Sequence, residues 1–185
     1  GAPYAGPRTY AAEGETTVTY AVRDVAGNPS TPETATFQVD TVAPVVNATI
    51  SGPDGEAGWY RGPVTVEVIG ADATSGLATL TLDGQPYSGP REFQAEGETV
   101  VAYAGRDVAG NVSAAQVSTF RIDATAPAFD LNLAGTPGRN GWYVSPVTVT
   151  LSGEAPVSGL AGLELGGAPY TGPQVLGAEG LNTVA

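Results

Sequence analysis

The feature that most constrains this chain is a repeat at a constant interval. The segment "YAGPRTYAAEG" at Tyr4 returns as "YSGPREFQAEG" at Tyr87 and as "YTGPQVLGAEG" at Tyr170, without an insertion or deletion. Residues 1–41 and 84–124 share 24 identities in 41 positions, which is far beyond coincidence. Self-similarity at a fixed period of this length indicates one small folded unit that is laid down repeatedly.

The repeat divides the chain out of phase with its own units. We expect residues 1–43 to be the C-terminal half of one unit, 44–126 to be a complete unit, and 127–185 to be the N-terminal part of a third. The borders fall in "DTVAP" and "DATAP". There Pro44 and Pro127 fix the backbone angle φ and stiffen the link between neighbours.

The composition and the alternation of apolar residues predict an all-β fold. The chain contains 26 Gly and 15 Pro, and these residues cost about 1 and about 3 kcal/mol in a helix interior. Seven short strands in about 80 residues, with turn signals every 8–12 residues, suit a two-sheet sandwich. The expected strands of the complete unit are marked by Ala48 and Ile50; Val64, Val66 and Val68; Leu80 and Leu82; Tyr87; Phe93; Val101 and Tyr103; and Phe120 and Ile122.

The order of these signals resembles a known family. "GWY…PVTV", "DATSGLA", "RDVAGN" and "D.TAP" are similar to the bacterial immunoglobulin-like (Big-type) tandem repeats of large surface adhesins and other extracellular proteins. The resemblance covers the whole chain, and the "D.AGN" hairpin followed by "D.TAP" is its most specific part. It implies seven-stranded Ig-like sandwiches, an extracellular or cell-surface location, and a role as a spacer or a binding module. The chain has no Cys pair and no Trp on the third strand, so antibody-like recognition is not implied.

The residue types that are missing argue against several functions. His, Cys and Lys are absent, which removes the usual general base, the thiol nucleophile and the Schiff-base amine. We therefore expect no enzymatic activity. The net charge of −12 leaves no basic surface for nucleic acid. No apolar run approaches the ~20 residues of a membrane span, and we expect any export signal or anchor to lie outside this stretch.

Acidic residues at turns predict a calcium site at the junction between units. In a seven-stranded unit, the loops after strands two and six lie at the pole where the chain enters, beside the linker from the preceding unit. Calcium takes six to eight oxygen ligands, many of them carboxylates. The candidate ligands at the middle junction are Asp40, Asp72, Asp107 and Asn111; Asp123 would serve the next junction, and Asp24 with Asn28 the previous one.

Turn chemistry is the alternative explanation of the same residues, and the pattern alone favours it. Asp and Asn in hairpins commonly bond their own backbone, and "AGN" supplies residues that tolerate a positive φ. In the third unit the position of Asp72 is taken by Ala155, with Glu154 beside it, which weakens the case for a fixed ligand.

Two aromatic pairs are open to a second interpretation. Trp59–Tyr60 and Trp142–Tyr143 could stack on sugar rings, but their identical placement in two units favours a packing role.

These observations predict structural repeats that form a semi-rigid rod, which holds a binding tip away from a cell or builds a filament. The alternative is a carbohydrate- or protein-binding module. The expected partners are neighbouring repeats of the same chain or other copies. The incomplete first and last units have two explanations. The chain is either a piece of a longer array, which is favoured because residues 1–19 and 167–185 correspond to the same part of the repeat, or two copies complete each other's end units head to tail.

Overall fold

The structure is a computed structural model that describes residues 4–183. The described residues form strands and turns, and they include no helix of the length and apolarity that a membrane span requires. The strands are β1 (Gly14–Tyr20), β2 (Glu33–Val39), β3 (Val45–Ser51), β4 (Trp59–Tyr60), β5 (Val64–Ala71), β6 (Leu77–Leu82), β7 (Gln85–Tyr87), β8 (Arg91–Phe93), β9 (Gly97–Asp107), β10 (Gln116–Ile122), β11 (Ala128–Ala134), β12 (Val147–Glu154), β13 (Glu164–Leu165), β14 (Ala168–Pro169) and β15 (Gln174–Leu176).

The chain divides into two compact units. The first holds the described residues up to Ser51 together with Thr65–Glu92 and Val100–Thr119. The second holds Gly52–Val64, Phe93–Thr99 and the described residues from Phe120 onwards. Strands β5, β8, β9 and β10 each contribute residues to both units. These limits follow local compactness rather than the repeat, so the domain borders predicted after residues 43 and 126 stay a prediction.

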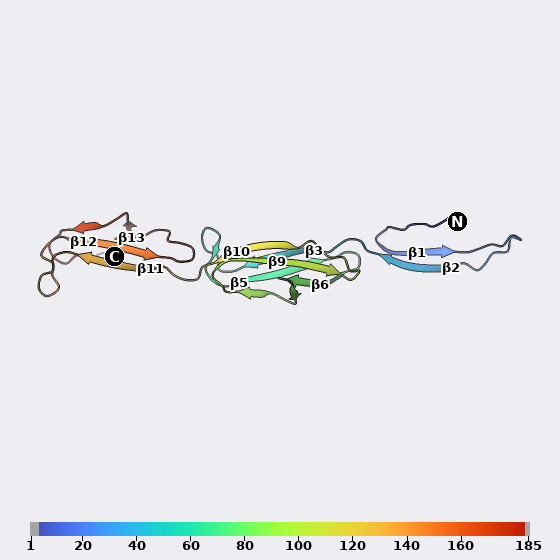
Figure 1. Cartoon of the computed structure of the whole chain (residues 1–185), viewed down its shortest axis with the longest axis horizontal. Helices are drawn as coiled ribbons and strands as arrows, with labels where there is room; N and C mark the ends of the chain where they lie inside the picture. Colours follow the sequence, from blue (N-terminus) through green and yellow to red (C-terminus); the bar gives the residue numbers. More distant parts are fainter. Residues whose placement is uncertain (1–3, 184–185) are drawn as a thin grey trace. The chain divides into compact units, whose positions relative to one another are not determined.

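In the first unit, β1 and β2 form an antiparallel hairpin that pairs Gly14 with Val39 and Tyr20 with Glu33 (Figure 1). Strand β6 lies between β7 and β9, and β3 pairs with β5. In the second unit, β11, β12 and β15 form an antiparallel sheet, and β13 pairs with β14.

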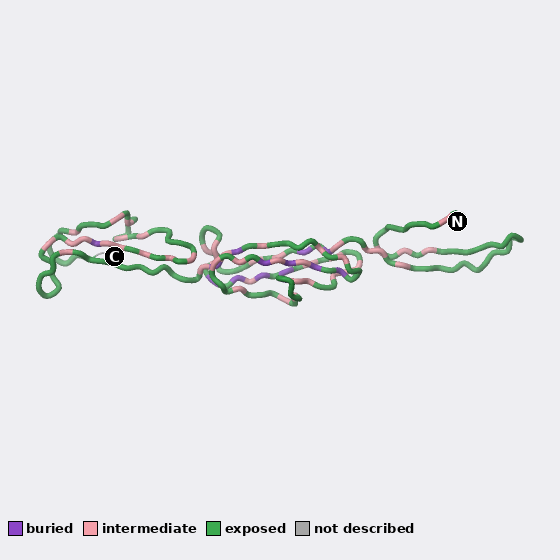
Figure 2. Tube along the Cα trace, viewed as in Figure 1, coloured by how far each residue is buried: buried purple, intermediate pink, exposed green. Residues whose placement is uncertain are grey.

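Alternate residues of the middle strands form the hydrophobic core. The buried positions of β5 are every second residue, Val64, Val66 and Val68, and each of them is at most 3% exposed. Val101 and Tyr103 continue the same alternation on β9. In Figure 2 the buried positions gather along the strands of the middle repeat. Strands buried on one face in the two sheets β4-β10-β9-β6-β7 and β3-β5-β8 make this an all-β sandwich.

The sequence pattern located all seven strands expected for the middle repeat, which are β3 and β5 to β10. It missed β4, because two residues cannot display a period. Strand β4 pairs in parallel with β10, so that Trp59 lies beside Arg121 and Tyr60 beside Ile122.

The 83-residue period is present in the strands themselves. Four strands have a counterpart whose two bounds both lie one full repeat further along: β2 and β10, β3 and β11, β5 and β12, and β8 and β15. The register recurs as well, since Val45 pairs with Ala71 and Ala128 pairs with Glu154.

Two of the tyrosines that precede the "GP" turns, Tyr87 and Tyr170, make equivalent hydrogen bonds. The Tyr87 hydroxyl accepts a hydrogen bond from the backbone N–H of Val68 at 2.9 Å. In the next repeat, the Tyr170 hydroxyl accepts one from the N–H of Leu151 at 3.1 Å. The same side chain therefore ties the same turn to the same strand in both repeats.

A matched pair of substitutions tests the core. Val101→Ala removes two methyl groups from a fully buried site, and we expect the free energy of unfolding to fall by about 2 kcal/mol in urea titrations. The control is Val18→Ala at the equivalent position of β1, which is only half-buried and should cost clearly less. Equal losses for the two variants would contradict the assignment of the core.

Candidate functional site

Three carboxylates from separate segments meet in the first unit. Asp40 follows β2, Asp72 follows β5, and Asp107 ends β9. Each offers an oxygen that lies within 4.8 Å of the oxygens of the other two. Asp107 is 1% exposed, whereas the other two are half-buried. The structure thus brings together the three acids that the sequence predicted for this junction.

Asp107 is held by the turn that follows it. Its Oδ1 accepts hydrogen bonds from the backbone N–H groups of Gly110 at 2.6 Å and Asn111 at 2.7 Å. Its Oδ2 accepts one from the Asn111 side chain at 2.8 Å. The turn needs Gly110 because φ is +106° there. Asp24 and Asn28 make the same two Asn contacts in the β1–β2 hairpin, at 2.7 and 2.8 Å.

Asn111 also contacts the linker. Its side-chain N–H group donates to the backbone carbonyl of Asp40 at 3.1 Å. In this orientation the amide nitrogen, rather than the oxygen, faces the acids. Asn111 therefore acts as a hydrogen-bond donor to the cluster, and its predicted role as an oxygen ligand stays a prediction.

Asp72 caps a loop of backbone amides. Its Oδ1 accepts hydrogen bonds from the N–H groups of Thr74, Ser75 and Gly76, at 3.1, 3.0 and 2.9 Å. Three converging N–H dipoles compensate the negative charge of a carboxylate without a cation.

Asp40 connects the linker to this loop. Its Oδ1 accepts from the N–H of Val42 at 3.1 Å, and its Oδ2 accepts from the N–H of Ser75 at 3.0 Å. The Ser75 hydroxyl, followed by these backbone amides, lowers the pKa of Asp40 below its ordinary value, because each donor favours the ionised carboxylate. We call the bond between Asp40 and Ser75 the Asp–Ser contact.

The Asp–Ser contact recurs one repeat further along. Asp123 accepts from the N–H groups of Thr125 at 3.1 Å and Ser158 at 3.0 Å. Donation from Ser158 is again the main cause that lowers the pKa of the carboxyl group. Ala155 stands where the first junction has Asp72, so the contact does not need the third acid. The sequence analysis assigned Asp123 to the next junction as a calcium ligand; the structure shows its contact with the Ser158 amide, and its role as a ligand stays a prediction.

Two glutamates of the preceding repeats also contact the linkers, and the sequence analysis missed both. Glu13 accepts hydrogen bonds from the N–H of Thr41 at 3.1 Å and from the Thr41 hydroxyl. Glu96 accepts from the N–H of Ala124 at 3.0 Å and from the Thr125 hydroxyl at 2.7 Å. We call these bonds the Glu–linker contacts. The constant "AEG" of the three copies was the available signal.

The three acids offer the oxygen ligands that calcium requires, but these oxygens also have hydrogen-bond partners in the absence of a cation. Five of the six carboxylate oxygens of Asp40, Asp72 and Asp107 accept the hydrogen bonds given above. A carboxylate oxygen can still use its remaining lone pair for a cation. Calcium binding therefore stays a prediction, and within the described residues only this junction brings three acids together.

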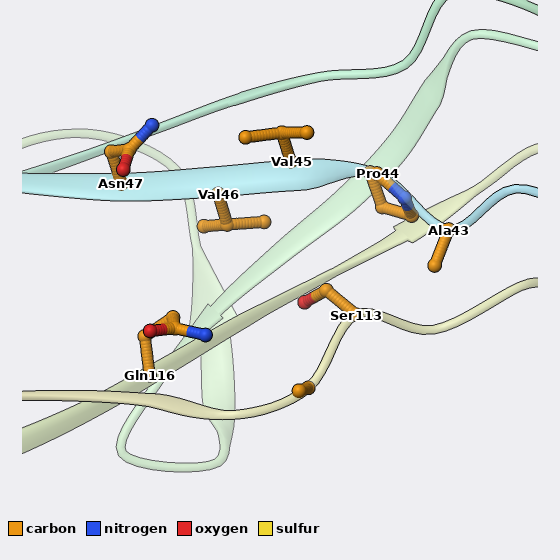
Figure 3. A pocket seen from close by; sticks show the side chains of 8 residues that line it. Ala43, Pro44, Val45, Val46, Asn47, Ser113 and Gln116 are labelled. Atoms are coloured by element: carbon orange, nitrogen blue, oxygen red, sulfur yellow. The ribbon is translucent and has the colours of Figure 1, made fainter.

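A shallow pocket of about 350 Å³ opens beside this junction (Figure 3). It lies between the start of β3 and the segment from Ser113 to Gln116. Val46 points towards that segment, whereas Val45 and Asn47 point away from it. The lining residues are apolar or uncharged, so this pocket offers no group for acid–base chemistry.

The two tryptophans share a turn but differ in burial. The N–H of Trp59 donates to the carbonyl of Glu56, and the N–H of Trp142 donates to that of Arg139. The Arg121 guanidinium lies 5.1 Å from the Trp59 ring centroid, which gives Trp59 a packing role. Trp142 is 61% exposed.

Comparison with known proteins finds similarity to two hyalins. No family model matches the chain. It is 31% identical to hyalin from Lytechinus variegatus over 166 residues, which covers 77% of this chain and 29% of that protein. It is 32% identical to hyalin from Strongylocentrotus purpuratus over 163 residues, which covers 77% of this chain and 13% of that protein. The chain thus spans less than a third of the relatives it matches. Both relatives come from animals, and the predicted membership of the bacterial repeat family stays a prediction.

The buried turn predicts a difference between two equivalent aspartates. Asp107→Ala leaves the amides of Gly110 and Asn111 without their acceptor, and we expect it to destabilise the middle repeat by about 2–3 kcal/mol. Asp24→Ala breaks the same bonds at an exposed site, so its effect in urea unfolding should be much smaller. Similar effects would show that burial does not set the strength of this turn.

Calcium would raise the melting temperature if the cluster is a site. Extracellular calcium modules bind in the range of about 10⁻⁴–10⁻³ M, so 10 mM calcium should stabilise the fold by roughly 1.5–2.5 kcal/mol, or several degrees. Calorimetry with magnesium at equal ionic strength is the control. Asp72→Ala should abolish the shift, and Asp123→Ala should preserve it. An unchanged melting temperature at 10 mM calcium would exclude the site.

The lowered pKa values predict acid sensitivity. Because the carboxyl groups of Asp40 and Asp123 have lower pKa values when folded, their contribution to stability is present above the unfolded pKa of about 3.9 and is lost as pH falls through the folded values. With no His in the chain, the melting temperature should be nearly constant from about pH 5 to 8. Asp40→Asn should reduce the slope below about pH 4, and an unaltered slope would argue against the Asp–Ser contact.

Proposed function

We propose that this chain is a stretch of non-catalytic structural repeats from an extracellular protein of the adhesin or filament type, in which the repeats act as spacers. The coarser part of this proposal, an extracellular adhesive or structural β-domain, is supported by the similarity to the two hyalins. The finer part, the spacer role, is supported by contacts at the linkers.

The repetition of the linker contacts carries the proposal. Asp40 and Asp123 each bond a serine amide of the following repeat. Glu13 and Glu96 belong to the repeat that precedes each linker. Each accepts hydrogen bonds from a linker amide and from the hydroxyl of a linker threonine. A linker held on both sides by the same bonds at each junction favours a constant geometry between neighbours.

A constant geometry would make length the property that the array controls. A strand of 8–10 residues at ~3.3 Å each gives a sandwich roughly 30 Å tall. Tandem copies with short, Pro-containing linkers would then form a semi-rigid rod whose reach increases with the number of copies.

The absence of Cys makes a distance measurement across the linker simple. Spin labels on cysteines introduced at the exposed positions Thr34 and Glu67 would report the distance between β2 and β5. We expect a narrow distribution, because both linker contacts restrict the motion. A broad distribution in the unsubstituted linker would refute the spacer proposal.

Linker variants make this test specific. Glu13→Ala and Asp40→Ala should each broaden the distance distribution, since each removes one side of the restraint. Glu15→Ala is the matched control, because Glu15 lies two residues from Glu13 and is exposed. Broadening by the control as well would attribute the effect to the hairpin rather than to the linker.

A further inference from the structure

Two short segments of the middle repeat carry the acceptor pattern for N-linked glycans. The pattern is an asparagine, any residue except Pro, and then Ser or Thr. It occurs as "NAT" at Asn47 and as "NVS" at Asn111. So short a pattern also arises by chance, so the surroundings of each asparagine have to distinguish the two.

The side chain of Asn111 is already engaged by the fold. A sugar would replace one of the two hydrogens on its Nδ2 atom, which donates to the carbonyl of Asp40 at 3.1 Å and to Oδ2 of Asp107 at 2.8 Å. The Ser113 hydroxyl of the same pattern accepts a hydrogen bond from the N–H of Gly105 at 2.9 Å. A glycan on Asn111 would therefore break the turn that contacts the linker.

The side chain of Asn47 lies on the outer face of β3. This strand buries Val46 and exposes Asn47 and Thr49, so the amide and the hydroxyl of the pattern share one face. Figure 3 shows Asn47 pointing away from the segment that contains Ser113. Within the described residues, no hydrogen bond engages the Asn47 side chain. A sugar on this amide would displace no contact of the fold.

Two exposed apolar side chains flank Asn47. Ile69 of β5 pairs directly with it, and Val45 precedes it by two residues on the same face of β3. Ile69 is 53% exposed and Val45 is 67% exposed. A directly opposite Cβ lies about 5 Å away, and one two residues along the strand lies about 7 Å away. One sugar ring on Asn47 can therefore cover both side chains.

The next repeat changes all three positions together. In place of the asparagine, the valine and the isoleucine it has Asp130, Ala128 and Ser152, and Asp130 pairs with Ser152 in the same register. All three are exposed as well, in a repeat that follows a complete one, so the exposure of this face does not come from the incomplete first unit. The apolar side chains are thus present beside the acceptor and absent where an acid replaces it.

The acceptor also lies on a strand at the edge of its sheet. Strand β3 stands at the end of the order β3-β5-β8, and edge strands invite pairing with other chains unless a charge or a covering group prevents it. Asp130 supplies a charge at this position in the next repeat. A bulky, hydrated glycan on Asn47 would give the middle repeat the same protection.

We propose that Asn47 is the acceptor of an N-linked oligosaccharide whose first sugar covers Val45 and Ile69, and that Asn111 stays unmodified in the folded protein. The donor is a lipid-linked oligosaccharide pyrophosphate. The bond from C1 of its first sugar to the pyrophosphate oxygen breaks, and a bond from C1 to Nδ2 of Asn47 forms. The lipid pyrophosphate leaves with the electron pair, and the amide proton passes to a base of the transferase. This site goes beyond the spacer role and rests only on its extracellular location.

Secretion of the 185-residue chain from an animal cell line, behind a signal peptide, tests the acceptor. We expect the secreted protein to lose mass on treatment with peptide-N-glycosidase. In heavy-oxygen water, peptide mass spectrometry should find Asn47, and not Asn111, converted to labelled aspartate. Thr49→Ala should abolish the mass loss, and Thr49→Ser should preserve it. Val112→Pro is the matched control, because it removes the second pattern at a position where the first hairpin already has Pro29, and it should leave the mass loss unchanged.

Four results would each overturn the assignment of the acceptor. They are a secreted chain without the mass loss, a loss that survives Thr49→Ala, a loss that disappears with Val112→Pro, and labelled aspartate at Asn111. None of them alters the distance distribution across the linker, so this proposal and the spacer role can fail separately.

The melting temperature tests the covering of the apolar side chains. Enzymatic removal of the glycan uncovers Val45 and Ile69, so the treated protein should melt at a lower temperature than the untreated one. Ile69→Ser, which introduces the residue of the next repeat, should reduce this difference. An equal difference in the parent chain and the variant would contradict the covering.

Discussion

The structure depends on one constraint, which is that the apolar face of each sheet must be covered by the other sheet. Strands buried on one face place Val64, Val66 and Val68 inwards, and such residues stabilise a fold only when the opposite layer removes them from water. Strands β9 and β10 complete that cover in the middle repeat. Val46 of β3, which is 7% exposed, is one of the residues that this cover removes from water.

At the junctions, hydrogen bonds from backbone amides compensate the repulsion between neighbouring carboxylates. Three carboxylates in one place repel each other, and within the described residues none of the three forms an ion pair with an arginine. Backbone amides take that role, since Asp72 alone accepts from three of them. The linker is thereby fixed through partial charges of the main chain, which remain when side chains vary. This explains how the contact of Asp123 with Ser158 persists although Ala155 replaces the neighbouring acid.

The sequence predicted the parts of the fold that are set by period and missed those that are set by tertiary contact. Alternation located the seven longer strands of the middle repeat, because half-buried strands display a period of two. It could not find β4, which is two residues long and exists because Trp59 and Tyr60 lie beside β10. The strand count also predicts that Asp40, Asp72 and Asp107 meet at one pole of the repeat, and their carboxylate oxygens do lie together.

The Glu–linker contacts could not be predicted in the same way, because they join residues that are 28 and 29 positions apart in the sequence. They also depend on the conformation of the glutamate side chain, which no local sequence pattern determines. The two linkers even use threonines at different positions, Thr41 in one and Thr125 in the other. In an alignment of the two repeats, Ala124 stands at the position of Thr41, so the threonine hydroxyl would be counted as lost. The long glutamate side chain accommodates the shift, so the contact is retained although the aligned residue is not.

The constant spacing of the strands has a consequence for how such a protein can evolve. Because equivalent strands and linker contacts recur at one fixed interval, removing or duplicating any stretch of one repeat length joins two sequences that are already in register. The position of the joint within the repeat does not matter, because the residues on its two sides are equivalent to residues that are already adjacent in an intact repeat. Unequal recombination between copies can therefore change the number of units in a gene while each product still folds.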